Sequence, residues 1–309
     1  MPAAQPLAYS AVVPTKDRRE AAEEALGVLL DQTRLPLRIV VVDASAPPYA
    51  PSDATTARAA RLGVELVVVR SRPSTSAQRN LGAQRVETPV LLFLDDDVRV
   101  PARYADVLLA HWEPAGLEGL GGIAGTPAVV PRQGRAARTL RRLAMLNYVD
   151  PSAEAMTLRR SGKVRYVPTP RRAVQVPALG AGATAYRTEL VLAHPFDERF
   201  PGYAPGEDLD MAVRVAAAAP LVQTPEVQWT HLWDPRERTS PTRWYVRGRC
   251  ETYFRLRRLD RSPATLAAFA LSLVAEGALA AADSVRERTP RHALGFAAGV
   301  FRSLLLPDG

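Results

Sequence analysis

The chain has 309 residues and a formal net charge of +8 at pH 7. Its 47% hydrophobic and 23% charged residues are typical of a globular protein and exclude a disordered chain. The single cysteine excludes an intrachain disulfide and favours a cytosolic protein, and the basic excess suits anionic partners such as nucleotides, lipid phosphates or nucleic acid.

The first hundred residues predict alternating strands and helices. Near-continuous apolar runs, which are typical of buried parallel strands, occur at 10–15, 37–42, 64–69 and 90–94. Helical spacing of apolar residues lies between these runs, at 17–32 and 76–85. The pattern predicts an α/β fold with a mostly parallel sheet flanked by helices, in which ligands bind beyond the carboxyl ends of the strands.

The rest of the chain begins with an arginine-rich segment, 132–172, which we interpret as an inserted surface element that is helical around 137–146. A helix at 207–219, a strand at 222–229 and three further helices at 242–259, 263–282 and 290–306 follow. We expect no signal peptide, because the amino terminus lacks a basic stretch followed by an apolar one. The nearest candidate for a membrane span, 264–282, carries Glu276, so no confident span is expected.

Three adjacent carboxylates, Asp95, Asp96 and Asp97, directly follow the apolar run 90–94. Such neighbours repel one another unless they are solvated or a cation neutralises them. Oxygen ligands suit Mg²⁺ or Mn²⁺, which bind one or two carboxylates together with substrate phosphates. The sequence therefore predicts a metal site here, and the alternative is an acidic turn or a helix cap.

Four other polar residues lie within predicted elements or at their ends. Asp43 closes a strand, where it would accept hydrogen bonds from a nucleoside or, equally, cap a turn. Arg79 lies on a helix and would meet a phosphate. Asp208 opens a helix after a glycine-rich loop, which suits either the helix dipole or a general base. His231 follows a strand; a lone histidine is more often structural than a metal ligand, and the predicted metal site raises the weight of the ligand interpretation.

Taken in order, these motifs resemble the family 2 glycosyltransferases, which have the GT-A fold, a Rossmann-like sheet. The matching stretches are the opening strand and loop (10–18), the nucleoside turn (41–45), the Arg-Asn-x-Gly helix (77–82) and the Asp-x-Asp motif (92–97). They continue with the acceptor-side loop (180–187 and 195–200) and the Glu-Asp motif (206–210). The resemblance covers roughly residues 8–235. The nucleoside turn reads Asp-Ala-Ser, where a second acidic residue is common in the family.

The resemblance implies an inverting transfer of a sugar from a nucleoside diphosphate sugar, with Mn²⁺ or Mg²⁺ as cofactor. Asp208 is then the base that deprotonates an acceptor hydroxyl, and the metal ligands are Asp95, Asp97 and His231. The implied donor contacts are Pro14, Thr15, Asp43, Arg79, Asp95 and Asp96. The implied acceptor-side residues are Gly182, Glu207 and Trp233.

We expect a GT-A catalytic domain at 1–240, with a donor half at 8–100 and an acceptor half at 101–240, and a helical C-terminal extension at 241–309. The expected acceptor is a lipid-linked or polysaccharide glycan of cell-envelope biosynthesis, and no nucleic-acid partner is expected. Arginines flank the apolar C-terminal helices. Two arrangements are therefore open. Either these helices lie on an anionic membrane, at the inner face of the plasma membrane, or they pack on the catalytic domain or form a homodimer interface.

Two other functions compete with this interpretation. A nucleotidyltransferase also pairs a Rossmann-like sheet with acidic metal ligands, but it usually needs a glycine-rich phosphate loop, and 14–16 reads Pro-Thr-Lys. A non-catalytic basic module would bind nucleic acid through the arginines of 132–142. That module leaves the three aspartates unexplained, because carboxylates repel phosphates.

Overall fold

The computed structural model describes residues 7–130, 133–167, 169–200, 202, 204–232 and 242–305. It divides into two compact units. Unit 1 comprises Met1–Val130, Thr169–Gly202 and Met211–Leu232, and unit 2 comprises Pro131–Pro168, Tyr203–Asp210 and Trp233–Gly309. The domain boundary expected at residue 240 stays a prediction, and the two units are described separately below.

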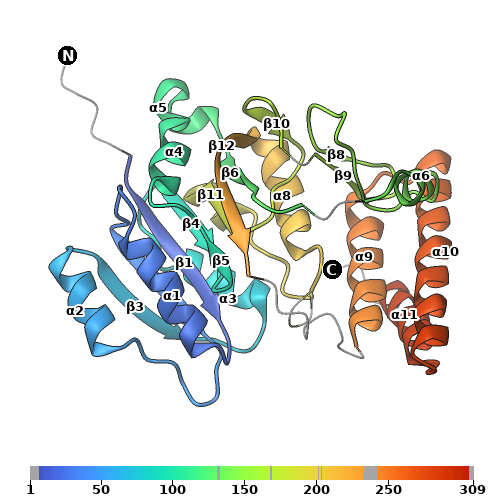
Figure 1. Ribbon diagram of the computed structural model, residues 1–309, viewed down its shortest axis with the longest axis horizontal. Helices are drawn as coiled ribbons and strands as arrows, with labels where there is room; N and C mark the ends of the chain where they lie inside the picture. Colours follow the sequence, from blue (N-terminus) through green and yellow to red (C-terminus); the bar gives the residue numbers. More distant parts are fainter. Residues whose placement is uncertain are drawn as a thin grey trace. The chain divides into compact units, whose positions relative to one another are not determined.

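Within the described residues, unit 1 is built on a nine-stranded sheet with the order β10-β12-β6-β11-β4-β1-β2-β3, and β5 pairs with β12 (Figure 1). The strands are β1 (Tyr9–Thr15), β2 (Arg38–Asp43), β3 (Glu65–Arg70), β4 (Val90–Leu94), β5 (Val98–Arg99), β6 (Gly122–Pro127), β10 (Val174–Val176), β11 (Ala183–Arg187) and β12 (Leu221–His231). This largely parallel sheet confirms the predicted fold class.

The register of the parallel strands brings polar residues to one edge. β1 pairs in parallel with both β2 and β4, and β2 pairs in parallel with β3. Thr15 lies opposite Asp43, and Asp43 lies opposite Arg70. β1 and β4 are buried along their whole length, so only their carboxyl ends can offer side chains to a ligand.

The helices of unit 1 are α1 (Arg19–Leu30), α2 (Asp53–Arg61), α3 (Thr75–Ala83), α4 (Tyr104–Ala110), α5 (Trp112–Ala115), a 3₁₀ turn (Leu117–Gly119) and α7 (Thr188–Ala193). α8 (Glu207–Ala218) begins in unit 2 and continues in unit 1. Close packing of α3 on β1 depends on Gly82, because a Cβ there would lie 2.3 Å from Val12 Cγ1. The Ser74 hydroxyl caps α3 by accepting a hydrogen bond from the Ala77 amide.

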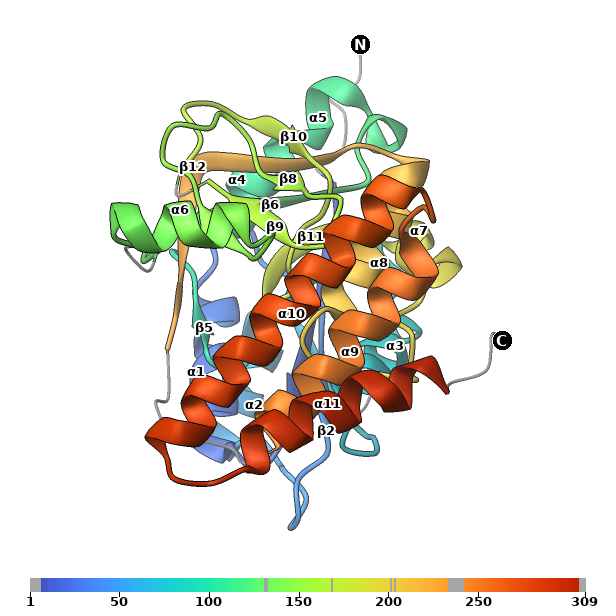
Figure 2. The same cartoon turned by 90° about the vertical axis from the view of Figure 1, so that its right-hand side faces the viewer.

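Unit 2 combines an inserted segment with three helices. The insert holds α6 (Arg135–Leu143) and a small sheet of β7 (Tyr148–Val149), β8 (Thr157–Leu158) and β9 (Val164–Tyr166). The helices α9 (Arg243–Arg258), α10 (Pro263–Arg286) and α11 (Arg291–Leu304) follow, with α10 beside α9 and α11 crossing below them in Figure 2. Glycines allow α9 and α11 to touch, because a Cβ at Gly299 would lie 2.1 Å from the Tyr245 carbonyl oxygen.

A buried cluster of charges joins the insert to α9 and α10. The Lys163 ammonium, 2% exposed, donates to Glu251 of α9 and Glu276 of α10. Arg247 of α9 also donates to Glu276, at 2.9 Å. Although burial opposes ionisation, the charges of Lys163 and Arg247 hold the pKa of Glu251 well below its usual range. This network fixes the position of the insert within unit 2.

Among the described residues, one helix, α10, is long and apolar enough to cross a membrane. It contains the segment 264–282 that the sequence singled out. Glu276 of this helix is fully buried and paired with Lys163, so one face of α10 packs within unit 2. Large apolar side chains on other faces of α10 are exposed.

Candidate active site

The three aspartates lie at the carboxyl end of β4, as predicted. Asp96 is 5% exposed, and its Oδ2 accepts a hydrogen bond of 2.8 Å from Thr15 Oγ1 at the end of β1. Burial raises the pKa of Asp96 to about 6, although the Thr15 hydroxyl and the Arg18 guanidinium oppose the shift. Asp96 therefore fastens the end of β4 to the end of β1.

Two arginines neutralise the aspartate run. Arg18, in the loop after β1, donates through Nη1 to Asp96 Oδ1 at 3.1 Å and to Asp97 Oδ2 at 2.8 Å. Arg79 of α3, 5% exposed, donates through Nη2 to Asp95 Oδ1 at 2.8 Å. The sequence singled out Arg79 but missed Arg18. Its position directly after the first strand was the available signal.

His231 faces Asp97 at the end of β12. The distance from His231 Nε2 to Asp97 Oδ1 is 3.5 Å. Pairing of β12 with β5 places His231 opposite Val98, and the Leu232 amide donates to the Asp97 carbonyl at 2.7 Å. The backbone of both elements therefore holds these two side chains together.

The donor set fits a hard divalent cation. Adjacent ligands of an octahedral ion at about 2.0–2.1 Å lie about 3 Å apart, close to the distance between Asp97 and His231. Within the described ranges, no group of three or more His, Cys, Asp or Glu side chains forms a complete metal cage. An ion bound here would need ligands from its substrate, as Mg²⁺ commonly takes from phosphates.

Gly182 precedes β11 beside the same aspartates. Its carbonyl accepts the Asp95 amide at 2.9 Å, and a Cβ at Gly182 would lie 3.1 Å from Asp95 Oδ2. A larger residue here would therefore press on the Asp95 carboxylate. The structure places Gly182 next to the candidate metal site, while its predicted contact with an acceptor stays a prediction.

Asp43 organises the turn after β2. Its fully buried carboxylate accepts the Ser45 and Tyr49 amides, each at 2.8 Å, and pairs with Arg70. Burial raises the pKa of Asp43, but the hydrogen bonds from Ser45, Tyr49 and Arg70 outweigh it and hold the pKa below its usual value. These contacts are those of the turn cap weighed from the sequence, and direct nucleoside contact stays a prediction.

Helix α3 ties the surrounding segments together. Gln78 Nε2 donates to the carbonyls of Thr15 and Val42, so it joins the ends of β1 and β2. Asn80 donates to the Phe196 carbonyl and accepts the Phe196 amide at 2.8 Å. Gln78 therefore supports the strand ends, and Asn80 of the Arg-Asn-x-Gly motif supports the loop after α7.

The start of α8, in unit 2, carries three carboxylates in different surroundings. Glu207 is buried, and Asp210 is fully buried with both oxygens on Arg258 of α9. Asp208 is only half-buried. Tyr166, at the end of β9, is 43% exposed, and loss of water around its hydroxyl together with the charges of Asp208 and Glu251 raises its pKa. Tyr166 and Arg258 are neighbours of this motif that the sequence did not reveal.

Trp233 lies outside the described residues.

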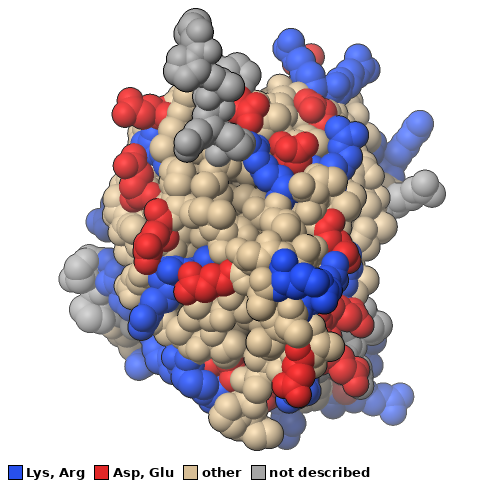
Figure 3. All heavy atoms as spheres, turned by 90° about the vertical axis from the view of Figure 1, so that its left-hand side faces the viewer, with Lys and Arg blue, Asp and Glu red and all other residues tan. Residues whose placement is uncertain are grey.

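On the face of the molecule drawn in Figure 3, acidic and basic side chains are interspersed, and the basic ones do not gather into one patch.

Comparisons with known proteins bear on the family and the fold. The model of glycosyl transferase family 2 matches residues 10–124. No curated protein matches the chain. Among solved structures, GalNAc-T7 with UDP, GalNAc and Mn²⁺ is similar at TM-score 0.57 and 15% identity, over 82% of this chain and 48% of that one. The chain thus spans about half of the length of GalNAc-T7.

Two further structures carry nucleotide sugars. TarS 1–349 of S. aureus in complex with UDP-GlcNAc is similar at TM-score 0.55 and 17% identity, over 86% of this chain and 72% of that one. The mannosyltransferase PcManGT of Pyrobaculum calidifontis, with GDP-Man and Mn²⁺, is similar at TM-score 0.51 and 17% identity, over 98% and 88%. At such identities the likeness shows a shared fold, which is the GT-A fold, and the model of glycosyl transferase family 2 matches less than half of the chain, at residues 10–124.

Proposed function

We propose that the chain is an inverting, metal-dependent glycosyltransferase that moves a sugar from a nucleoside diphosphate sugar to a hydroxyl of a glycan or lipid-linked acceptor. The pairing of Asp97 with His231, 3.5 Å apart at the edge where β1, β2 and β4 end, carries this proposal. The match to glycosyl transferase family 2 and the nucleotide-sugar complexes of similar structures support it.

The donor binds at the aspartate run, where the charges of the carboxylates are neutralised by Arg18 and Arg79. Asp97 and His231 hold Mn²⁺ or Mg²⁺, with Asp95 as a further ligand. The bound ion supplies Lewis-acid stabilisation of the departing nucleoside diphosphate. Arg18 and Arg79, which neutralise the aspartates in the structure, add positive charge for the phosphates.

The nucleoside half of the donor lies along the ends of β1 and β2. Pro14 and Thr15 end β1, and the Thr15 hydroxyl is oriented by Asp96. Asp43 holds the following turn through the amides of Ser45 and Tyr49. A turn fixed before the ligand arrives loses little entropy on binding, which favours recognition of a rigid base and ribose.

Asp208 acts as the general base on the acceptor hydroxyl, and Glu207, Gly182 and Trp233 serve the acceptor side. Asp208 removes the proton as the hydroxyl oxygen attacks the anomeric carbon from the face opposite the nucleoside diphosphate. Because the attack and the departure occur on opposite faces, the anomeric configuration inverts. Positioned proton transfer contributes on the order of 100- to 10,000-fold in rate.

A donor screen tests the proposal. UDP-, GDP- and dTDP-sugars are incubated with Mn²⁺ or Mg²⁺ and mixed glycan and lipid-linked acceptors, and the released nucleotide is identified. A nucleoside diphosphate that appears only with metal supports a glycosyltransferase. Pyrophosphate would instead identify the nucleotidyltransferase, and no released nucleotide with any donor would contradict the proposal.

Asp208→Asn tests the base. Turnover should fall by about 100-fold or more, because the amide cannot accept the proton. Asp53→Asn is the matched control, since Asp53 is an exposed acid in the first turn of α2 and loses the same interaction with the helix dipole. Near wild-type turnover of a folded Asp208→Asn protein would remove Asp208 from the mechanism.

We place the enzyme in the cytoplasm, at the inner face of the plasma membrane, in the synthesis of a cell-envelope polysaccharide. The single, buried Cys250 suits a reducing compartment. Apolar side chains exposed on α10 and α11, with arginines beside them, suit a membrane-bound acceptor. A homodimer that covers these helices is the competing arrangement.

A further inference from the structure

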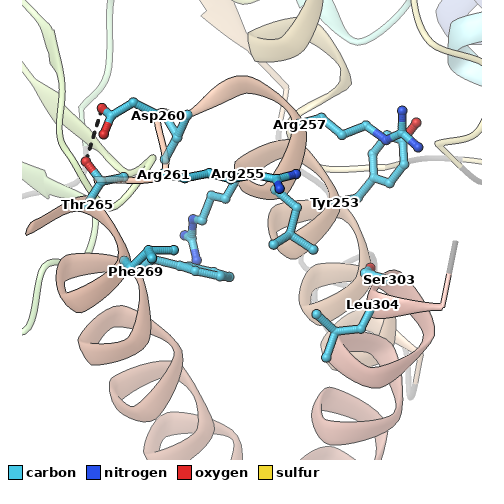
Figure 4. Close-up of a pocket in the computed structure, with 12 residues that line it drawn as sticks. Tyr253, Arg255, Arg257, Asp260, Arg261, Thr265, Phe269, Ser303 and Leu304 are labelled. Carbon is cyan, nitrogen blue, oxygen red and sulfur yellow. Dashed lines mark hydrogen bonds between the residues drawn. The ribbon is translucent and has the colours of Figure 1, made fainter. Parts of the chain in front are cut away.

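A pocket of about 370 Å³ lies among the ends of α9, α10 and α11 in unit 2 (Figure 4). Three arginines contribute to its lining: Arg255, Arg257 and Arg261. Leu266 and Phe269 of α10 and Leu304 of α11 form much of the apolar lining. None of the residues assigned above to sugar transfer lines this pocket.

Arg255 is the buried basic group of the pocket. Its side chain is 2% exposed, and its guanidinium lies over the Phe269 ring, 5.2 Å from the ring centroid. Nη2 is 3.6 Å from Glu251, whereas Nη1 is buried and has no hydrogen-bond partner among the described residues. An unsatisfied buried donor destabilises a fold, so the positive charge of Arg255 is incompletely balanced by its neighbours.

Packing against the insert fixes the position of the Arg255 side chain. Gly162 of the insert packs on its side chain so closely that a Cβ there would lie 2.7 Å from Arg255 Cγ. Gly162 has a φ of +76°, which other residues rarely adopt. The chain thus holds this guanidinium in place, which is a property of a built site.

The other charged groups leave the pocket basic. Arg257 lies over the Tyr253 ring at 4.9 Å, and Arg261 is exposed near the pocket mouth. The one acid in the lining, Asp260, accepts the Ser262 amide at 2.9 Å and the Thr265 hydroxyl at 3.2 Å (Figure 4). Asp260 therefore serves the start of α10. With Glu251 counted against Arg255, three arginines face two acids, and the excess positive charge attracts an anion.

The apolar side of the pocket continues onto exposed helix surfaces. Leu266 is 49% and Leu304 is 58% exposed. Further exposed apolar residues on α10, on α11 and directly after it are Leu271, Val274, Phe301 and Leu305. A ligand that matches both parts has an anionic head for the arginines and a long apolar tail for these helices.

We propose that this pocket binds the phosphate headgroup of an anionic membrane lipid, with the lipid chain along Leu266, Phe269 and Leu304. The basic flanks and the exposed apolar helix faces give this end of unit 2 both attractions that hold a protein on an anionic leaflet. The site goes beyond the proposed sugar transfer, because it needs neither donor nor metal.

Vesicle binding by the full chain tests the site. Wild-type protein should sediment with phosphatidylcholine vesicles that contain phosphatidylglycerol and not with phosphatidylcholine alone. In Arg257→Gln/Arg261→Gln, the partition coefficient should fall by about 25-fold, since each arginine near an anionic surface contributes about fivefold. Arg61→Gln/Arg85→Gln, which removes the same charge at exposed positions outside the pocket, should leave it unchanged.

A monomeric ligand separates the pocket from general attraction to a charged surface. Dihexanoyl phosphatidic acid should bind in titration calorimetry, and inorganic phosphate should bind at least tenfold more weakly because it lacks the apolar chains. Leu266→Trp, which keeps the charge but fills the pocket, should abolish the lipid binding while thermal unfolding stays unchanged.

Equal binding of phosphate and lipid, an equal loss in the control pair, or binding of lipid by Leu266→Trp would overturn the proposal. A stable dimer that does not bind anionic vesicles would also overturn the proposal. The exposed helix faces would then be assigned to contact with a second copy of the chain. The assays contain no nucleotide sugar, so their failure would leave the proposed transferase activity untouched.

Discussion

Gly82→Ala should destabilise unit 1, although alanine is the better helix former. In the interior of a helix, alanine is favoured over glycine by about 1 kcal/mol. The new Cβ would lie 2.3 Å from Val12 Cγ1 and 3.1 Å from Val42 Cγ2. Carbon atoms pack at about 3.5–4.0 Å, so Val12 or α3 would have to move by more than about 1 Å.

The core around Gly82 offers no room for that movement. Val12 and Val42 are fully buried in β1 and β2, and β-branched side chains have few rotamers. Overpacking of a dense core costs about 1–3 kcal/mol, and this overlap belongs at the upper end. After subtraction of the helix-propensity gain, we expect a net loss of about 2 kcal/mol in the free energy of unfolding.

Gly27→Ala is the matched control, because Gly27 lies inside α1 and a Cβ there meets nothing within 4 Å. It should stabilise the protein by about 0.5–1 kcal/mol, since only helix propensity acts. Urea unfolding followed by tryptophan fluorescence should place the Gly82→Ala midpoint below wild type and the Gly27→Ala midpoint above it. A Gly82→Ala midpoint equal to that of Gly27→Ala would refute the packing argument.

Three further outcomes follow from the structure. Lys163→Met should cost about 3–5 kcal/mol in stability by leaving Glu276 and Glu251 short of a buried cation, and the added change Glu276→Leu should restore part of the loss in urea unfolding. Cys250, whose pKa burial raises to about 12, should remain a thiol and resist Ellman's reagent at pH 8 until the protein unfolds; rapid labelling of the native protein would contradict this. His231→Ala should raise the Mn²⁺ concentration needed for half-maximal donor turnover. The increase should be at least roughly 10- to 100-fold, which is the effect of losing a residue that only hydrogen-bonds a metal ligand. An unchanged Mn²⁺ requirement would exclude His231 as a ligand.

Local patterns made β1 to β4, β12, α1, α3 and α8 predictable, whereas β5, β6, β10, β11, α4 and α5 had not been predicted. β1, β2 and β4 are buried along nearly their whole length, and such strands have continuous apolar sequences, whereas the edge strand β3 is apolar in sequence but only half-buried. The aspartate run was visible for the same reason, because it interrupts such a run at its carboxyl end. The amphipathic helices α9, α10 and α11 were predictable from their spacing within one or a few residues.

The remaining features depend on contacts between residues that are distant in sequence. Arg18 meets Asp96 and Asp97 across 78 and 79 positions, so a solvated arginine and a neutralising one look alike in the chain. Lys163 reaches Glu251 and Glu276 across 88 and 113 positions. The insert therefore carried no local signal of the buried network that orders it.

At the start of α8, contacts with distant residues show which of two neighbouring aspartates can act as the general base, a distinction that the sequence alone does not make. Asp208 and Asp210 are both acids in the first turn, where the helix dipole favours either. Asp210 is fully buried and gives both oxygens to Arg258, so it has no free oxygen or access for an acceptor hydroxyl. Asp208 keeps part of its surface and lies near Tyr166. A general base must reach the proton that it removes, so the base is expected to be Asp208, while Asp210 anchors the helix that presents it.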